Sequence, residues 1–217
     1  MFMSNHLIGF GATQEEAASI ALAGTVASTT ISGIATSHPL NMPSGITAGE
    51  LLVMCAMLDR DRVAPSGLSG WTQLFWANAD PGLGLYYKTA AGGETLTLTY
   101  GVGLNASYDV LRITNWQGTP ENTTTATGSS TAPNSGSISP SWGTASASFF
   151  ISMASQFNTS SITTTGVPTN YTGPHPSTAG SGAMAYRVAT ASSEDPSAFT
   201  ISTSIGWAAR TVAIRSL

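Results

Sequence analysis

The chain has 217 residues, a formal net charge of -4 and only 8% charged side chains, against roughly 25% in an average soluble domain. Such an acidic, charge-poor chain carries no basic footprint for a nucleic-acid backbone, so we expect no direct DNA or RNA binding. The single cysteine, Cys55, excludes an intrachain disulfide, and its apolar neighbours predict a buried, inert thiol.

The first residues lack the basic and apolar segments of a secretory signal, and no apolar run approaches the roughly 20 residues that cross a bilayer. We therefore expect a protein that is made in a cytoplasm and does not enter a membrane. Serine, threonine, glycine and alanine occupy the positions where charges usually stand. Because threonine favours strands and lysine and glutamate do not, this composition predicts an all-β fold.

Residues 1–35 are predicted to form an N-terminal arm with the first strand or strands. Thr13–Glu16 fits a helix capping box and Gly24 a helix stop, so a short helix and an extended arm both remain open there. The β-branched residues between 25 and 34 favour a strand. Pro39, Pro43 and Gly45 are expected to break the chain after it.

Residues 51–58 contain almost no polar side chain, which is typical of a strand covered on both faces, inside a sandwich or at an oligomer contact. Turn signals then separate expected strands at 70–76, 83–89, 94–100 and 108–113. The echo of this pattern begins with an apolar strand at 148–154 and ends with a β-branched strand at 211–215. In both copies a middle strand carries an aromatic residue followed by a cation, Tyr87-Lys88 in the first and Tyr186-Arg187 in the second.

The echo predicts two pseudo-repeats, at about 46–116 and 142–217, whose sheets close over one shared core. Between them, residues 117–140 read as a polar connector that crosses the surface. We therefore predict one all-β domain, a jelly-roll-like β-sandwich over residues 36–217 preceded by the N-terminal arm.

No group of residues indicates catalysis or metal binding. His6, His38 and His175 are isolated from other ligand-type residues. Asp59 and Asp61 stand at a spacing that suits a calcium site or an acid and base pair, but the neighbouring Arg60 and Arg62 favour a solvated ion-pair cluster. We expect no catalytic, cofactor-binding or metal-ligating residue.

Five tryptophans and several tyrosines offer faces that stack on sugar rings, although most of them stand where a strand plugs the core. Trp76, Tyr86 and Trp116 are the three that core packing accounts for least well. We take them as the candidate ligand contacts.

Several short motifs follow one another in a fixed order: Ile46-x-Ala48-Gly49-Glu50-Leu51-Leu52, Gly70-Trp71-Thr72, Tyr86-Tyr87-Lys88-Thr89-Ala90 and Trp207-Ala208-Ala209 before Val212-Ala213-Ile214-Arg215. This order resembles a loose family of β-sandwich proteins encoded among tailed-phage and prophage structural genes. The likeness covers most of residues 7–217, and its motifs are structural. The Ala-rich insertion at residues 15–23 departs from the pattern.

The resemblance implies a non-enzymatic virion component, and we expect a capsid decoration protein that cements the head by packing at subunit seams. Its partners would be the major capsid protein, other virion subunits or further copies of itself in a homo-oligomer. The alternative is a tail or fibre adhesin that binds carbohydrate on the host surface.

Overall fold

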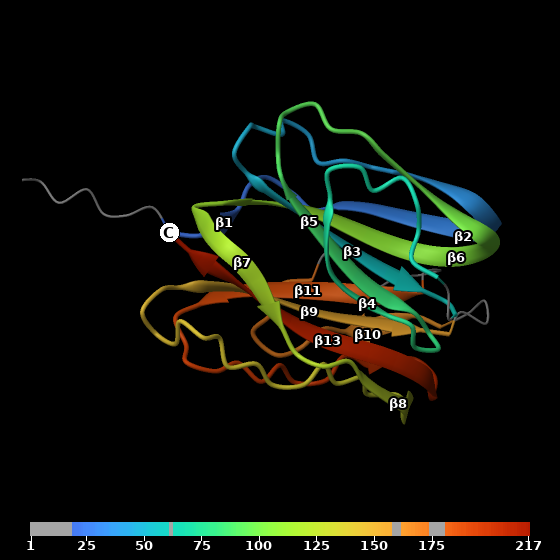
Figure 1. The fold of residues 1–217 in the computed structure, drawn as a ribbon. Coiled ribbons are helices and arrows are strands. Elements are labelled where there is room, and N and C mark those ends of the chain that lie inside the picture. The colour runs from blue at the N-terminus through green and yellow to red at the C-terminus, as the bar shows by residue number, and fades with distance from the viewer. Residues whose placement is uncertain (1–18, 61–62, 158–161, 174–180) are drawn as a thin grey trace, which may run out of the picture.

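The computed structural model describes residues 19–60, 63–157, 162–173 and 181–217, and every regular element in this part of the chain is a β-strand. Figure 1 shows two sheets stacked face to face, and the all-β sandwich expected from the sequence is confirmed. Residues 1–18 lie outside the described part, so most of the expected arm is not described. Where the sequence allowed a short helix ending at Gly24, the structure has a short strand at Ala21–Leu22 instead.

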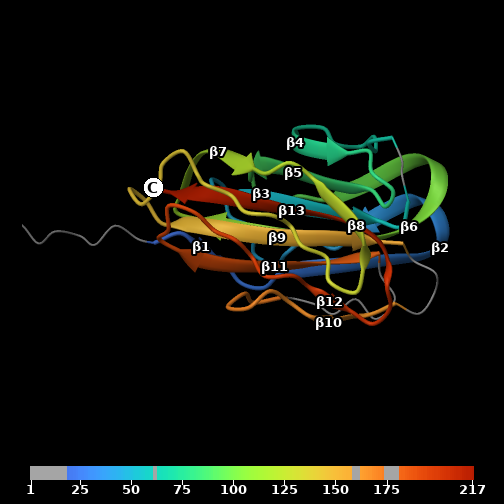
Figure 2. The ribbon, with the colours of Figure 1, turned by 90° about the horizontal axis from the view of Figure 1, so that it is seen from below.

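Each sheet is antiparallel, and the chain completes one before it enters the other. Sheet A has the order β1 (Ala21–Leu22), β6 (Leu96–Thr114), β3 (Leu51–Leu58), β5 (Leu83–Thr89) and β4 (Thr72–Ala77), with β2 (Ala27–Leu40) also paired to β6. Sheet B has the order β11 (Gly182–Ala189), β9 (Ser148–Gln156), β13 (Ile205–Ser216) and β7 (Trp116–Asn122), with β8 (Ala126–Ser130) also paired to β13. A small separate sheet joins β10 (Thr164–Gly166) to β12 (Thr200–Ile201) below sheet B (Figure 2).

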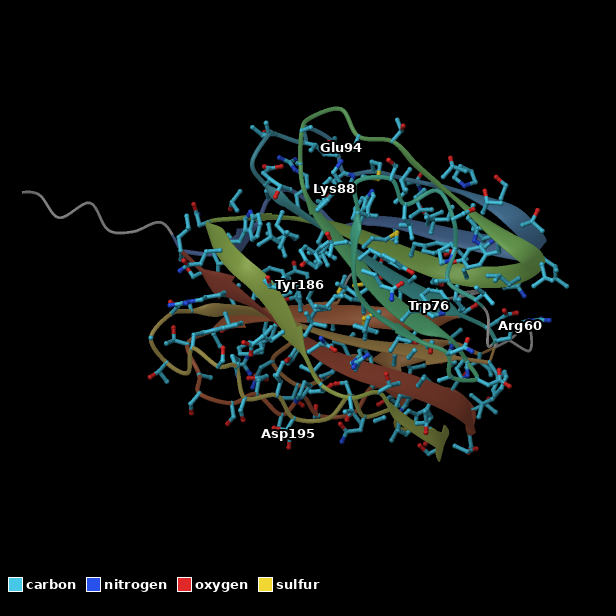
Figure 3. All side chains as sticks on the ribbon, in the orientation of Figure 1. Arg60, Trp76, Lys88, Glu94, Tyr186 and Asp195 are labelled. Carbon is cyan, nitrogen blue, oxygen red and sulfur yellow. The ribbon has the colours of Figure 1, made fainter. Side chains whose placement is uncertain are left out.

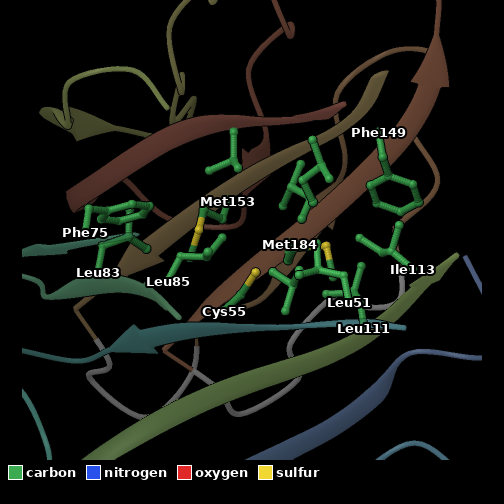
Figure 4. Close-up of a cluster of buried hydrophobic side chains, with 14 of the residues drawn as sticks. Leu51, Cys55, Phe75, Leu83, Leu85, Leu111, Ile113, Phe149, Met153 and Met184 are labelled. Carbon is green, nitrogen blue, oxygen red and sulfur yellow. The ribbon is translucent and has the colours of Figure 1, made fainter. Parts of the chain in front are cut away.

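The central core lies between the two sheets. Alternate residues of β3, among them Val53 and Cys55, point into it from sheet A, and Ile151 and Met153 of β9 point into it from sheet B. Figure 4 shows side chains of this core, Cys55 and Met153 among them, between the strands of the two sheets. Cys55 is fully buried there, as the sequence predicts.

Both faces of the two central strands are buried, and each outer face belongs to a further apolar cluster. Every residue of β3 and of β9 is buried. The outer face of sheet A packs against the first half of β6 and the end of β2, and the outer face of sheet B packs against the loops that contain Ile138, Tyr171 and Phe199. For residues 51–58 the sequence allowed either a position inside the sandwich or an oligomer contact. In the structure, other segments of the same chain cover the outer face of this strand.

The cover of sheet A is a two-stranded ribbon that folds back on itself. Residues 27–31 of β2 pair with 110–106 of β6, and after a bulge residues 37–40 pair with 99–96. The ribbon bends so tightly that the side-chain amide of Asn41, just after β2, donates to the carbonyl oxygen of Ser28 near the start of the same strand. The expectation of separate strands at 94–100 and 108–113 is therefore wrong, because one 19-residue strand bends through the Gly101–Gly103 segment. Pro39 also lies within β2 and does not end it.

The echo in the sequence corresponds to matching positions in the two sheets. In each sheet the apolar strand of the echo is central, with the aromatic-plus-cation strand on one side and the β-branched strand on the other. The registers also match: Val53 pairs with Tyr87 and Leu111, and Ile151 pairs with Tyr186 and Val212.

The stretch 117–140 differs from the surface connector that its composition suggests. Residues 116–122 and 126–130 are the strands β7 and β8, which pair with the two ends of β13. Polar threonine and serine side chains suit such strands because one of their faces remains in water. Residues 123–125 join the two strands, and the part after Ser130 runs as a loop across the outer face of sheet B.

A close contact between the two sheets at Gly182 predicts the effect of one added methyl group. A Cβ atom added at Gly182 would lie 2.2 Å from the carbonyl oxygen of Ala154 and 2.7 Å from the Cβ atom of Met57 in the opposite sheet. We expect Gly182→Ala to lower the free energy of unfolding by about 2 kcal/mol or more, measured by urea denaturation. Gly101→Ala is the control, because nothing lies within 4 Å of its added Cβ. Equal stability of the two variants would contradict this packing.

Candidate functional site

Two of the three candidate ligand contacts, Trp76 and Tyr86, lie together on the outer side of sheet A, with ring centroids 6.2 Å apart. Trp76 is half-buried and its ring covers Gly84, where a Cβ atom would come within 2.3 Å of it. Tyr86 is only 2% exposed, and its hydroxyl donates to Oε1 of Gln73 over 3.2 Å. Burial raises the pKa of Tyr86. Tyr86 is therefore part of the core, whereas Trp76, which Figure 3 labels on β4, is half-buried.

Trp116 does not join them. It begins β7 in sheet B and packs against the central core, and its ring Nε1 donates to the carbonyl oxygen of Gly49 over 3.1 Å. This bond ties the start of sheet B to the turn before β3. The structure thus divides the three candidate contacts between two places, with no shared groove that all three would line.

A buried polar chain that the sequence does not indicate lies under the folded ribbon. Nδ1 of His38 is 2.6 Å from the hydroxyl of Tyr108, which lies 3.0 Å from the hydroxyl of Tyr100, and Nε2 of His38 is 2.8 Å from the carbonyl oxygen of Ala35. His38 is fully buried, and this burial lowers its pKa below the ordinary value of 6.5, with the Ala35 bond opposing the shift. A neutral ring with its proton on Nε2 satisfies both neighbours. Nothing in the local sequence signals this contact, because its partners lie about 70 residues apart and meet only when the ribbon folds.

Of the acidic residues near the end of β3, the structure describes Asp59, which is held by neighbouring side chains. Asp59 is 2% exposed, is bound by Arg60 through two hydrogen bonds, and accepts a third from Nδ2 of Asn105 over 2.8 Å. Asp59 raises the pKa of Arg60. Asp61 and Arg62 lie outside the described residues, so the predicted solvated cluster is described only in part.

Two further ion pairs occupy equivalent places in the two sheets. Lys88 of β5 lies 3.5 Å from Glu94, and Arg187 of β11 lies 3.1 Å from Glu194. Glu194 also accepts from the hydroxyl of Tyr171 over 3.2 Å. In both sheets the cation that follows the echoed tyrosine therefore forms an ion pair with a glutamate in the segment that follows its own strand.

The most buried pair joins Glu50 to Arg112, which are 8% and 9% exposed. Nε and Nη2 of the guanidinium donate to the two carboxylate oxygens over 2.7 and 2.6 Å, and Nη1 donates to the carbonyl oxygen of Ser44. Arg112 holds the pKa of Glu50 below its usual value, and the pair raises the pKa of Arg112. This bidentate pair fixes the turn before β3 to the last part of β6.

Because many of the described charged residues are paired in this way, the described part of the surface carries few charges. Among the described charged residues, Asp80 and Asp195 are exposed, and the side chain of Arg60 is 39% exposed. Figure 3 labels Asp195 and Arg60. Arg210 is half-buried at the side of the central core, where its guanidinium lies 4.1 Å from the centroid of the Phe75 ring and its Nε donates to the carbonyl oxygen of Thr123. Burial lowers the pKa of Arg210.

Described residues line two hollows on the surface. One, of about 240 Å³, lies beside β1 and β11 and is lined by Leu22, Val26, Tyr186 and small neighbouring residues. The other, of about 200 Å³, is lined by Val63, Tyr100, Gly101 and Val102. The described residues that line these hollows include no histidine, cysteine, carboxylate, lysine or arginine.

The described residues bring together no set of three histidine, cysteine, aspartate or glutamate side chains that could hold a metal ion. In the same part of the chain, no helix long and apolar enough to cross a membrane is found. His38 is the only histidine there, since His6 and His175 lie outside it, and its ring bonds to Tyr108 and Ala35. Comparisons with protein-family models, with curated proteins and with solved structures gave no match.

The buried histidine predicts a pH dependence of stability. The folded chain resists protonation of His38 while the unfolded chain takes up a proton near pH 6.5, so the free energy of unfolding falls as the pH drops through that value. We expect this decline between about pH 7.5 and about pH 5.5, above the range in which most carboxylates titrate. Urea denaturation at a series of pH values measures it.

For this measurement, both chains carry His6→Gln and His175→Gln, which removes the other two histidines. Adding His38→Gln should flatten the profile in this pH range. An equal slope with and without His38 would show that another group causes the decline.

The Glu50–Arg112 pair predicts a strong coupling between two substitutions. Glu50→Gln leaves a buried guanidinium without its counter-charge, and we expect a loss of about 3 kcal/mol in the free energy of unfolding. The double variant Glu50→Gln/Arg112→Met removes the stranded charge as well. It should lose clearly less than the sum of the two single variants in a double-mutant cycle followed by urea denaturation. Additive losses would contradict a coupled buried pair.

Proposed function

We propose that this chain is a non-enzymatic structural protein of a bacteriophage virion, and specifically a decoration protein that stabilises the capsid. It is made in the host cytoplasm and becomes part of the particle, where it packs over the seams between subunits of the major capsid protein. The proposal assigns it no catalytic residue, no cofactor and no metal.

The observation that carries the proposal is the low charge of the surface that the described residues form. Of the described charged residues, those other than Asp80 and Asp195 are buried or half-buried, many of them in ion pairs within the chain. Hydroxyl and amide groups form close contacts without the long-range repulsion that like charges impose on neighbouring copies. Such a surface suits dense packing in an assembly, in which burial of surface stabilises at about 25 cal/mol per Å² of apolar area.

The sandwich itself also suits this role. Its apolar interior is closed by its own ribbon and loops, so the fold does not need a partner to cover the central strands. A subunit of this kind adds to a preformed shell as a finished unit. The motif order also resembles that of tailed-phage structural proteins, and this resemblance is a second ground for the proposal.

The alternative function, a tail or fibre adhesin that binds host carbohydrate, draws its support from one residue. Trp76 is half-buried over Gly84 and presents part of its ring on the outer side of sheet A. Aromatic faces of this kind stack on sugar rings. Tyr86 and Trp116 add little, because the first is buried and the second is bonded to Gly49.

The copy number in the virion tests the proposal. We expect quantitative mass spectrometry of purified particles of the phage that encodes this chain to find it in a simple ratio to the major capsid protein. Particles that lack the chain should release their DNA at a lower temperature, and adding the purified chain back should restore the original value. Complete absence from the particle would overturn the proposal.

The adhesin alternative predicts a different result in the same preparation. The chain would be present in the few copies of a tail component, and the purified protein would bind a glycan array. That binding should be lost in Trp76→Ala and retained in Trp142→Ala, a matched change at another half-buried tryptophan.

A further inference from the structure

The arm of β2 that folds back over sheet A is held down by few buried side chains. We call residues 32–40 the strap. Within it the side chains of His38 and Leu40 are buried and that of Ala35 is half-buried, whereas the others are exposed. Among the described residues the strap pairs with β6 alone, and Pro39 has no N–H to donate to that ladder (Figure 1). Segments with so few buried contacts open before the rest of a folded protein does.

The two ends of the strap are fixed by contacts outside it. Before the strap, Ile31 pairs with Ala106 in sheet A. After it, the backbone amide of Asn41 donates to Oγ1 of Thr29 over 2.8 Å, and the side-chain amide of Asn41 donates to the carbonyl oxygen of Ser28 over 2.9 Å. These contacts close the base of the strap, so it can lift from sheet A while its ends stay in place.

The bend at the start of the strap is strained. Ile34 has a φ of 58°, and this left-handed backbone is costly for a β-branched residue. Two side chains hold the bend: Oδ1 of Asn105 accepts from the amides of Gly33 and Ile34 over 3.1 and 3.4 Å, and Nε2 of His38 lies 2.8 Å from the carbonyl oxygen of Ala35. Opening relieves the strain, and of these two side chains His38 is the one that titrates near neutral pH.

The described groups around His38 offer no counter-charge to a protonated ring. The ring faces the phenols of Tyr108 and Tyr100 from β6, with centroids 5.6 and 4.9 Å away, and Tyr86 of β5 lies in the same cluster. Burial raises the pKa of all three tyrosines, so they stay neutral. The members of this cluster from β3 are apolar.

The charged group that is linked to the bend is already balanced. Oδ2 of Asp59 accepts from the side-chain amide of Asn105 over 2.8 Å, and the same oxygen lies 3.0 Å from Nη2 of Arg60. Protonation of His38 at Nδ1 would therefore leave a positive charge that is buried and unbalanced among the described groups, and it would oblige the hydroxyl of Tyr108 to turn.

We infer that the strap is an acid-sensitive device, in which protonation of His38 releases residues 32–40 from the outer side of sheet A while the two stacked sheets stay folded. The strap contributes no side chain to the described core between the sheets, so its release leaves that core intact. Opening hydrates the ring and uncovers the edge of β6 over residues 96–104.

The direction of the pH response follows from the burial of the ring. The closed strap favours neutral His38, because burial holds its pKa below the ordinary value of 6.5, whereas the hydrated ring of the open strap takes up a proton near that value. Opening therefore increases as the pH falls below 6.5 and is suppressed above it. The inference goes beyond the virion role and does not depend on it.

Hydrogen exchange followed by mass spectrometry tests this device on the purified full chain, with His6→Gln and His175→Gln present throughout. The rates are corrected for the intrinsic pH dependence of exchange. We expect the hydrogen-bonded amides of the strap to exchange at least about tenfold faster than those of β9, and low urea concentrations to speed exchange in β9 but not in the strap. Between about pH 7.5 and about pH 5.5 the strap rate should rise several-fold, up to about tenfold.

Two variants separate titration from packing. His38→Gln should make the strap rate independent of pH in this range. Leu40→Ala, which trims the other buried side chain of the strap, should raise the rate at both pH values and keep their ratio. A strap that exchanges only together with β9, a strap rate in the parent chain that does not change with pH, or an unchanged pH response in His38→Gln would overturn the inference.

Discussion

Burial of both faces of the two central strands is the constraint on which the rest of this structure depends. β3 and β9 expose no side chain, so each sheet needs a cover on its outer side in addition to its partner sheet. The folded ribbon of β2 and β6 covers one sheet and the loops after Ser130 cover the other. The long strand, the bulges and the inward ion pairs all serve to hold these covers in place.

The sequence predicted the parts of this fold that local patterns encode. Strand 83–89 and the central strand 51–58 were predicted with their observed bounds, because an apolar run between turn residues identifies a buried strand. The sequence could not show that β6 continues through Gly101 and Gly103, because glycines there indicate a break between strands. The strand is continuous because both of its halves pair with β2, about 70 residues away in the sequence. The sequence predicts a surface connector where residues 117–130 contain strands for a related reason: polar strands at a sheet edge lack the apolar alternation that identifies a strand.

The candidate ligand contacts show the same limit of prediction from local sequence patterns. Core packing and ligand binding both favour aromatic residues in strands, so composition alone did not separate buried Tyr86 from half-exposed Trp76. The contact of His38 with Tyr108, and that of Glu50 with Arg112, join segments more than 60 residues apart and have no local signature. The matched pairs Lys88–Glu94 and Arg187–Glu194 are the exception, because in each the acidic residue follows its cation closely in sequence.

The two sheets meet the same constraint with different chemistry. At equivalent outward positions, Met54 in β3 packs in the apolar cluster under the ribbon, whereas Ser152 in β9 lies 2.8 Å from the hydroxyl of Ser135. Thr211 joins this group, 2.9 Å from the Ser135 hydroxyl and 2.6 Å from the carbonyl oxygen of Gly136. Hydrogen bonds depend on direction, whereas apolar packing needs only a matching shape. The loops over sheet B are therefore held at defined points, and the segments between those points are free to differ in sequence without loss of the core beneath them.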